Sequence, residues 1–189
     1  ELEQLAIFGE IDFNITEKLT LTSGIRWFDF RETKILNKDG ILANQVIIDH
    51  KASMEDQGYS PRLMANYKLT EEVSLNAQVS RGFRLGGIND PLNLGGCTQP
   101  DLETFGPFAR PFDNEELTNY EVGSKMRLLE NRGQLNVSVF HSEIENLQAT
   151  VDASSCLSSI IVNVPEASAT GIEFELQAYI TDNIEFAFS

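Results

Sequence analysis

Apolar and polar residues alternate along several stretches of the chain, with the period of two that a β-strand shows when one face is apolar and the other polar. The clearest stretch has Tyr59, Pro61, Leu63, Ala65 and Tyr67 on one face and Ser60, Arg62, Met64, Asn66 and Lys68 on the other. After residues 69–72 the alternation returns, with Val73, Leu75, Ala77 and Val79 set against Ser74, Asn76, Gln78 and Ser80. Two alternating runs separated by a short turn predict a β-hairpin.

The same pattern predicts seven strands and the start of an eighth. We place them at residues 4–14, 18–30, 58–68, 73–84, 116–128, 134–148 and 168–180, with the last strand beginning at residue 184. The connections alternate in length: residues 15–17, 69–72, 129–133 and 181–183 are short, whereas residues 31–57, 85–115 and 149–167 are long. An antiparallel up-and-down meander of this kind has one end with tight turns and one end with long loops.

Strand and loop lengths together favour an all-β transmembrane β-barrel over a soluble sandwich. Sandwich strands average about five or six residues, whereas the strands predicted here span about 11 to 15. Outer-membrane strands need about 9–11 residues, with tight periplasmic turns, long outer loops, an apolar face toward lipid and a polar face toward the lumen. Trp27, Tyr59 and Phe83 at the long-loop ends, and Phe13 and Tyr67 at the tight-turn ends, would lie at the lipid head groups. A sandwich with these rings in its core is the alternative.

Composition and charge narrow the class further. The chain has 189 residues, with 14 Lys and Arg against 29 Asp and Glu, so its formal net charge is −15. This balance argues against nucleic-acid binding, which relies on a basic face. The longest apolar run, Leu5-Ala6-Ile7-Phe8, has four residues, whereas a membrane-spanning helix needs about 20. The chain begins at Glu1 without a basic-then-apolar leader, so we expect a mature or internal segment.

Candidate ligand-binding residues gather at the end of one strand and in the long segment after it. Arg84 closes the strand at 73–84, and the following segment contains Phe105, Phe108, Arg110 and Phe112. Guanidinium groups bind carboxylates and phosphates bidentately, and aromatic rings cover organic ligands. We take these five residues as ligand-binding candidates. The alternative is that the rings only pack the loop onto its neighbours and that the arginines pair with acids of the strands.

Other constellations offer weaker chemistry. The run Gly82-Phe83-Arg84-Leu85-Gly86-Gly87 superficially resembles a phosphate-binding loop, but no helix is predicted to follow it. His141 and Ser142 raise the alternative of an outer-membrane hydrolase, although the sequence offers no motif for an orienting group or an oxyanion hole. The two histidines, His50 and His141, are too few and too separated for a histidine-rich metal site. We expect no catalytic residue, no metal and no cofactor.

The two cysteines, Cys97 and Cys156, lie 59 positions apart, and both fall in predicted long loops. They form neither a CxxC pair nor a metal-ligand cluster. Because the cell exterior and the periplasm are oxidising, we expect a disulfide between them, with two free thiols as the alternative. In the chain-entropy treatment, a bridge across such a segment stabilises the fold by roughly 4 kcal/mol.

Several strings resemble the β-barrel region of the TonB-dependent outer-membrane receptors. They are Phe8-Gly9-Glu10, the run at 15–27, Ser60-Pro61-Arg62-Leu63, Val79-Ser80-Arg81-Gly82-Phe83-Arg84 with Gly86-Gly87-Ile88-Asn89, the run at 116–125, and Gly171-Ile172-Glu173-Phe174-Glu175-Leu176. No single string is decisive. Their order and spacing carry the resemblance, which covers nearly the whole chain.

The resemblance implies an integral outer-membrane protein of a Gram-negative bacterium, with about 22 antiparallel strands around a plug domain. Such receptors import scarce nutrients, including ferric siderophores, haem, cobalamin or glycans. The implied partners are outer-membrane lipid, the TonB energy-coupling system reached through the plug, and a small-molecule ligand such as an iron chelate. This sequence has no plug-like segment and about eight strands, so we interpret residues 1–189 as a partial barrel. A small eight-stranded passive or adhesive outer-membrane barrel is the main alternative.

Overall fold

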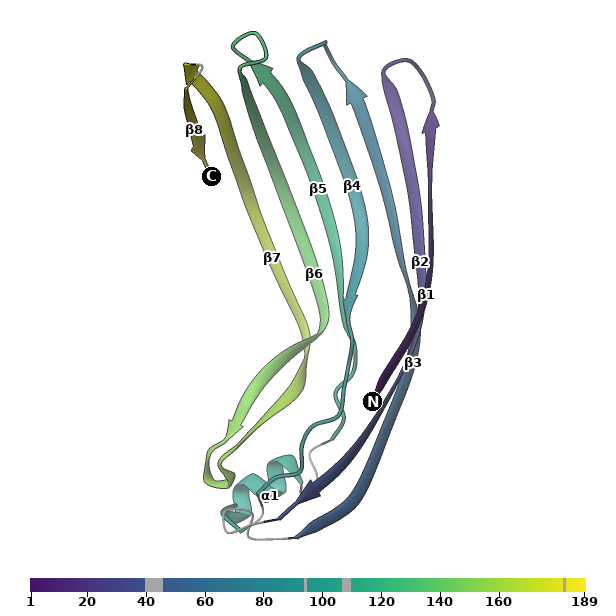
Figure 1. Cartoon of the computed structure of the whole chain (residues 1–189), viewed down its shortest axis with the longest axis vertical. Coiled ribbons are helices and arrows are strands. Elements are labelled where there is room, and N and C mark those ends of the chain that lie inside the picture. Colours follow the sequence, from purple (N-terminus) through teal and green to yellow (C-terminus); the bar gives the residue numbers. More distant parts are fainter. Residues whose placement is uncertain (40–45, 94, 107–109, 182) are drawn as a thin grey trace.

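A computed structural model gives the fold of residues 1–39, 46–93, 95–106, 110–181 and 183–189. Eight strands form one antiparallel sheet in chain order (Figure 1). The strands are β1 (Leu2–Asn14), β2 (Leu19–Lys38), β3 (Ile47–Lys68), β4 (Val73–Arg84), β5 (Glu115–Leu128), β6 (Gly133–Ala153), β7 (Ser158–Thr181) and β8 (Ile184–Phe188). The helix α1 (Gln99–Phe105) and the short 3-10 helix η1 (Ser154–Cys156) lie in the long connections.

The sheet is a single open layer. Each strand pairs with its neighbours in sequence, and β1 and β8 form the two edges. Within the ranges given above, no second sheet covers either face and the edges do not meet. The soluble sandwich and the closed eight-stranded barrel are therefore both wrong, whereas the predicted all-β, antiparallel up-and-down topology is confirmed. None of the helices in the described part of the chain is both long and apolar enough to cross a membrane.

Two hairpins are longer than the sequence predicts. The β2–β3 ladder runs on to the pair Lys38 and Ile47, through most of the segment that we expected to be a loop. Its outer part carries polar side chains on both faces, so the hydrophobic alternation ends although the backbone ladder continues. The β6–β7 ladder likewise continues to Ala153 and Ser158. In the sequence, Pro165 argues against a strand at this position, because proline cannot donate a ladder hydrogen bond. In the structure, β7 continues through it.

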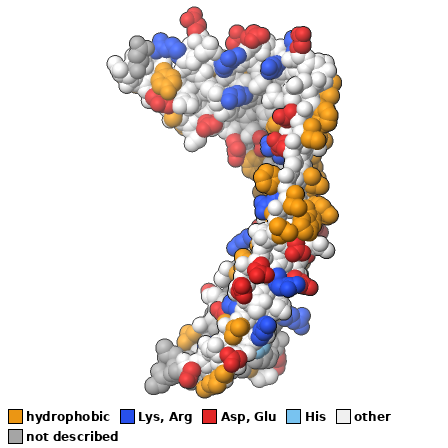
Figure 2. Space-filling model, turned by 45° about the vertical axis from the view of Figure 1, so that its right-hand side comes forward, with side chains coloured by type: hydrophobic (Ala, Val, Ile, Leu, Met, Phe, Trp, Pro, Cys, Tyr) orange, Lys and Arg blue, Asp and Glu red, His pale blue; other side chains and the backbone are white. Residues whose placement is uncertain are grey.

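The two faces of the sheet differ in chemistry. On the face that we call the outer face, apolar side chains such as Ile7, Val122 and Ile172 are 65%, 63% and 75% exposed. Figure 2 shows hydrophobic side chains along the convex side of the middle of the molecule, with charged side chains above and below them. The opposite face, the inner face, is mostly polar. The predicted division into an apolar and a polar face is confirmed.

Polar side chains on the inner face contact one another across neighbouring strands. Arg62 of β3 lies 3.7 Å from the Glu10 carboxylate of β1 and donates to the Gln78 side chain of β4 at 3.3 Å. Gln78 in turn donates to the Glu121 carboxylate of β5 at 3.1 Å. This chain of contacts satisfies polar groups on the inner face and joins β1, β3, β4 and β5, passing across β2.

Two inner-face glycines make room for aromatic rings of the neighbouring strand. Gly58 pairs with Phe28 across the β2–β3 ladder, and Gly171 pairs with Phe140 across the β6–β7 ladder. A Cβ atom on Gly58 would lie 2.8 Å from the Phe28 ring, and one on Gly171 would lie 2.7 Å from the Phe140 ring. Because a register slip would place a side chain under either ring, these two pairs help to fix the register of both long hairpins.

We expect Gly171→Val to destabilise the protein by about 1–3 kcal/mol, because the added methyl groups would overlap the Phe140 ring. Urea unfolding of the detergent-extracted protein, followed by circular dichroism, measures the change. Gly9→Val is the matched control, since a Cβ atom on Gly9 meets no atom within 4 Å. Equal losses of stability in the two variants would contradict this explanation.

Candidate functional site

Three connections meet at the end of the sheet opposite the tight turns. They are the outer parts of the β2–β3 and β6–β7 hairpins and the long connection from β4 to β5. We call this connection, residues 85–114, the β4–β5 segment. Its helix α1 lies between the ends of the two hairpins (Figure 1). The structure therefore brings three chain segments together at the end of the sheet where the sequence predicts the ligand-binding loops.

Polar contacts anchor the β4–β5 segment to the β2–β3 hairpin. The Lys34 amino group of β2 lies 2.7 Å from the Asp90 carboxylate. Asn114, whose side chain is buried, donates to the Asp56 carboxylate of β3 at 2.6 Å. Because Asn114 precedes β5 directly and Asp90 follows β4 by a few residues, both ends of the segment are held on the same side.

Two asparagines attach the same segment to β7. The Asn89 side chain donates to the carbonyl of Ile161 at 2.7 Å and accepts from the N–H of Ile161 at 2.8 Å. Asn163 of β7 accepts from the N–H of Asp113 at 2.7 Å and donates to its carbonyl at 3.1 Å. The Asn89 amide thus pairs with the backbone of β7 as a neighbouring strand would, and the Asn163 amide does the same for the backbone of Asp113 in the β4–β5 segment.

A small apolar core and a disulfide join the β4–β5 segment to the β6–β7 hairpin. Leu92 is buried together with Ala153, Cys156 and Ile160. The structure joins Cys97 to Cys156 by a disulfide with an S–S distance of 2.12 Å. The core and the covalent bond therefore lie at the same place, between two connections that are far apart in sequence.

A hollow of about 320 Å³ lies where the β4–β5 segment meets β7. Its walls are formed by Asn89, Thr104, Phe105, Arg110, Pro111 and Phe112 and by residues 160–163. This volume falls at the lower end of the range of about 300–1,000 Å³ that is usual for small-molecule sites. The hollow combines two aromatic rings, one guanidinium group and neutral hydrogen-bonding groups.

The contacts around Arg110 fix its backbone. The Arg110 carbonyl accepts from the Asn89 side chain at 2.8 Å, and Asn89 is itself held on β7. The Arg110 side chain is exposed, and no carboxylate of the described residues forms an ion pair with it. Its charge is therefore available to an anionic group of a ligand.

The structure brings together three of the five predicted ligand-binding residues, namely Phe105, Arg110 and Phe112. Phe108 lies outside the described residues. Arg84 is exposed at the end of β4 and does not line the hollow, so the hollow gives its predicted role no support. Ligand contact by all five residues stays a prediction. The anchoring asparagines were missed, because nothing in the sequence distinguishes them from other loop asparagines.

The glycines after β4 serve a close approach between two backbones. Gly87 pairs with Phe112, with N–H to carbonyl distances of 3.0 Å and 2.9 Å in the two directions. A Cβ atom on Gly86 would overlap the Phe112 carbonyl oxygen. Because α1 begins only at Gln99, the glycines do not lead into a helix N-terminus as a phosphate-binding loop does.

The hydrolase alternative does not fit the geometry. Consecutive residues of a strand point to opposite faces, so His141 and Ser142 of β6 are directed away from each other. Ser142 donates to the Asn119 side chain at 2.8 Å, whereas the Nδ1 atom of His141 lies 2.7 Å from the Thr170 hydroxyl. A nucleophile and its base must be within hydrogen-bond reach of each other, which these two residues are not.

Removal of the disulfide should loosen the loop end of the sheet. The double variant Cys97→Ser/Cys156→Ser loses a cross-link over 59 residues, worth roughly 4 kcal/mol in the chain-entropy treatment. We expect a lower thermal unfolding temperature and faster protease cleavage in the β4–β5 segment. Reductant should produce the same change in the unmodified protein and none in the variant. Equal protease sensitivity of all samples would contradict the assigned role.

The sequence and the fold both match one family of membrane receptors. The family model described as "TonB dependent receptor-like, beta-barrel" matches residues 1–189. The pesticin receptor of Yersinia pestis is 24% identical over 173 residues, which are 92% of this chain and 23% of the relative. The probable TonB-dependent siderophore receptor PiuA of Acinetobacter baumannii is 23% identical over 181 residues, which are 96% of this chain and 22% of the relative.

A solved structure shows the same arrangement of strands. The ferric yersiniabactin uptake receptor FyuA from Yersinia pestis matches with a TM-score of 0.71 and 19% identity. The match covers 96% of this chain and 25% of that receptor. At this identity the likeness concerns the fold. The chain spans about a quarter of the length of these relatives.

Proposed function

Because this chain belongs to the TonB-dependent receptor β-barrel family, we propose that it supplies part of the barrel wall and the ligand-capturing loops of an outer-membrane receptor for energy-dependent nutrient uptake. One observation carries the proposal: a single-layer sheet with an exposed apolar face ends in packed loops that enclose a hollow. The receptor would be integral to the outer membrane of a Gram-negative bacterium and draw on the TonB system. The chain itself would do no covalent chemistry.

The open edges of the sheet support a partial barrel. An unpaired strand edge exposes backbone donors and acceptors, which cannot be satisfied in hydrocarbon. We propose that residues 1–189 supply eight neighbouring strands of a larger barrel, of about 22 strands. Strands outside these residues would then pair with β1 and β8, and the plug domain would also lie outside them.

The spacing of aromatic and charged side chains supports a position in the membrane. Tyr59 and Tyr67 share the outer face of β3 eight residues apart, which is roughly 26 Å along a strand and about 20 Å across a tilted one. Trp27 of β2 pairs with Tyr59 at the end of the apolar face that is nearer the long loops. On β4, the outer-face residues are followed toward the long-loop end by Arg81, which forms an ion pair with Glu116 of β5. Such a charged pair suits the head-group region, not hydrocarbon.

We propose a ferric siderophore or a similar metal chelate as the ligand. The relatives include a probable siderophore receptor and a ferric yersiniabactin uptake receptor. The rings of Phe105 and Phe112 can cover flat organic groups, and the Arg110 guanidinium can bind a carboxylate or a phenolate. Because both walls of the hollow are anchored, the site would be formed before the ligand arrives.

Arg110→Gln should weaken the receptor's binding of its ferric siderophore about 10- to 100-fold. This corresponds to the loss of about 1.5–3 kcal/mol for a hydrogen bond to a charged group. Equilibrium binding of a panel of radiolabelled ferric catecholates and ferric hydroxamates to whole cells measures the effect.

Arg31→Gln is the matched control for this experiment. Arg31 is an exposed arginine at the same end of the sheet, it is paired with Glu55 at 3.0 Å, and it does not line the hollow. Both variants should reach the outer membrane in normal amounts. Unchanged affinity of Arg110→Gln for every ferric siderophore that the unmodified receptor binds would rule out the proposed contact.

A second experiment tests the membrane position of the sheet. Val122→Arg puts a charge on the exposed apolar outer face and should cost up to about 2–4 kcal/mol, whereas Ser138→Arg on the inner face of the adjacent strand should be tolerated. The fraction of receptor that folds into lipid vesicles of known composition measures the difference. If the two arginines impair insertion equally, the outer face does not contact hydrocarbon.

A further inference from the structure

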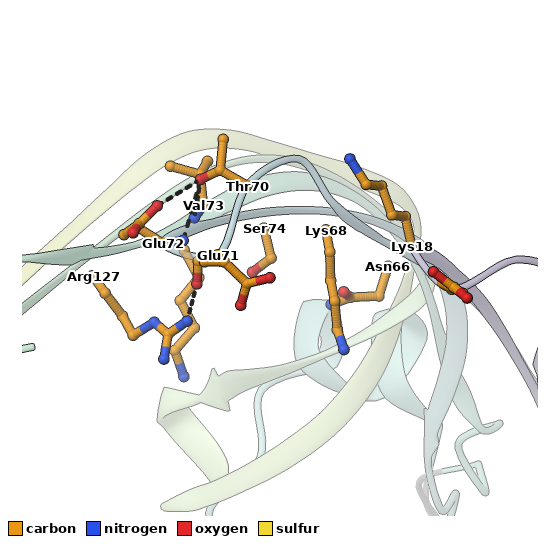
Figure 3. A pocket seen from close by; sticks show the side chains of 11 residues that line it. Lys18, Asn66, Lys68, Thr70, Glu71, Glu72, Val73, Ser74 and Arg127 are labelled. Carbon is orange, nitrogen blue, oxygen red and sulfur yellow. Dashed lines mark hydrogen bonds between the residues drawn. The ribbon is translucent and has the colours of Figure 1, made fainter.

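A second hollow, of about 700 Å³, lies on the inner face at the tight-turn end of the sheet (Figure 3). Lys68 of β3 and Lys125 and Arg127 of β5 contribute to its walls. In Figure 3 the sheet forms an arch, and Lys68 and Arg127 point to its concave side, whereas the amino group of Lys18 points the other way. The sheet thus carries positive charge near both of its ends, here and at Arg110 in the long-loop hollow.

Lys68 and Lys125 lie in one row across the inner face. Ser74 of β4 stands between them, because it pairs with Lys68 on one side and with Lys125 on the other. Neighbouring strands are about 4.8 Å apart, so the backbones of the two lysines are separated by about 10 Å. Because the side chain between them is that of a small serine, the row leaves room for a molecule between the two amino groups.

No carboxylate neutralises the two lysines within the described residues. Elsewhere on the inner face, the Arg62 guanidinium lies 3.7 Å from the Glu10 carboxylate. No acid of the described residues forms such an ion pair with Lys68 or Lys125. Like charges that face each other across strands repel, so an anion between the two amino groups would relieve this repulsion.

The acidic residues of this hollow stand on the turns, not on the strands. Four basic and three acidic residues line the hollow. Glu17 lies in the turn before β2, and Glu71 and Glu72 lie in the turn before β4. The Glu72 carboxylate accepts from the Thr70 hydroxyl at 3.1 Å, so the turn itself uses this acid. The hollow is therefore positive on balance, in a chain whose formal net charge is −15.

The chemistry of the hollow suits a small anion that is held only briefly. Its volume falls within the range of about 300–1,000 Å³ that is usual for small-molecule sites. A guanidinium group binds a carboxylate through two parallel hydrogen bonds, whereas a lysine ammonium group is a compact and strongly hydrated point charge. Two lysines therefore hold an anion with less geometric fit than an arginine does. A site on a transport path needs this property, because it must attract the passing molecule and still release it.

We propose that Lys68 and Lys125 form a transient binding site for an anionic metal chelate as it leaves the barrel at the tight-turn end, and that this site favours the transport of negatively charged chelates. The inference rests on the proposed function, because it requires the sheet to be part of an uptake receptor. Two observations select this ligand: the described residues offer the two amino groups no carboxylate, and the hollow has the size of a small-molecule site.

Transport measurements on the full-length receptor in whole cells test this proposal. Lys68→Gln/Lys125→Gln removes both charges, and Lys68→Arg/Lys125→Arg keeps them. We expect the Gln double variant to bind a radiolabelled anionic ferric catecholate with unchanged affinity but to import it at least about fivefold more slowly, since electrostatic attraction raises such rates about tenfold or more. The Arg double variant should import it at the normal rate. Lys18→Gln is the matched control, because the Lys18 amino group points away from the concave side.

An uncharged ferric hydroxamate gives a readout that a purely structural role of the lysines would not produce. The Gln double variant should import this chelate as fast as the unmodified receptor does, because the passage of an uncharged molecule does not depend on positive charge. In a receptor that imports only the catecholate, the comparison of the Gln and Arg double variants decides alone.

Three results would overturn the proposal and leave the proposed function intact. They are normal import of the catecholate by the Gln double variant, equal slowing of import in the Gln and Arg double variants, and equal slowing of both chelates in the Gln double variant. If the unmodified receptor imports neither chelate, the proposed function is contradicted, and this inference is contradicted with it.

Discussion

This architecture depends on an apolar face that no second layer covers among the described residues. Side chains such as Ile7 and Ile172 stand more than half exposed, and few large apolar residues are fully buried. In water, each exposed square ångström of such a face would cost about 25 cal/mol relative to burial. Hydrocarbon removes this cost without a protein partner, provided that every backbone group finds its hydrogen bond within the sheet. The neighbour-to-neighbour ladder from β1 to β8 meets most of that requirement, although its two edges are unpaired and the β3–β4 ladder ends at the pair Arg62 and Ser80.

Beyond the apolar band, a different set of interactions holds the chain. The β2–β3 and β6–β7 hairpins continue as ladders with polar surfaces, and the β4–β5 segment lies between them. Side-chain amides of Asn89 and Asn163 replace strand partners, and the disulfide coincides with a small apolar core. The loop end is consequently a packed unit with a hollow at its joint. Preorganisation of this kind lowers the entropy that a ligand must overcome on binding.

The sequence predicts the strands whose alternation of apolar and polar residues is required by their surroundings. It misses the contacts that depend on the register between strands. Alternation in β3 and β4 is visible because lipid on one side and polar surroundings on the other demand it at every second residue. The outer parts of the long hairpins lack that demand, so their strands could not be seen. Residue type alone singled out Phe105 and Arg110 as candidates, and both line the hollow, whereas their contact with a ligand stays a prediction. Lys68 and Lys125 come close on one face only because Ser74 of β4 pairs with both of them, and no local pattern encodes this.

The covalent bond between the loops also sets a topological condition. Residues 97–156 form a closed circle, and this circle contains the whole of β5 and β6 with their tight turn. Once Cys97 and Cys156 are joined, the two loop-side ends of this hairpin are tied to one point. The two strands therefore stay tethered to each other even when the ladder between them opens.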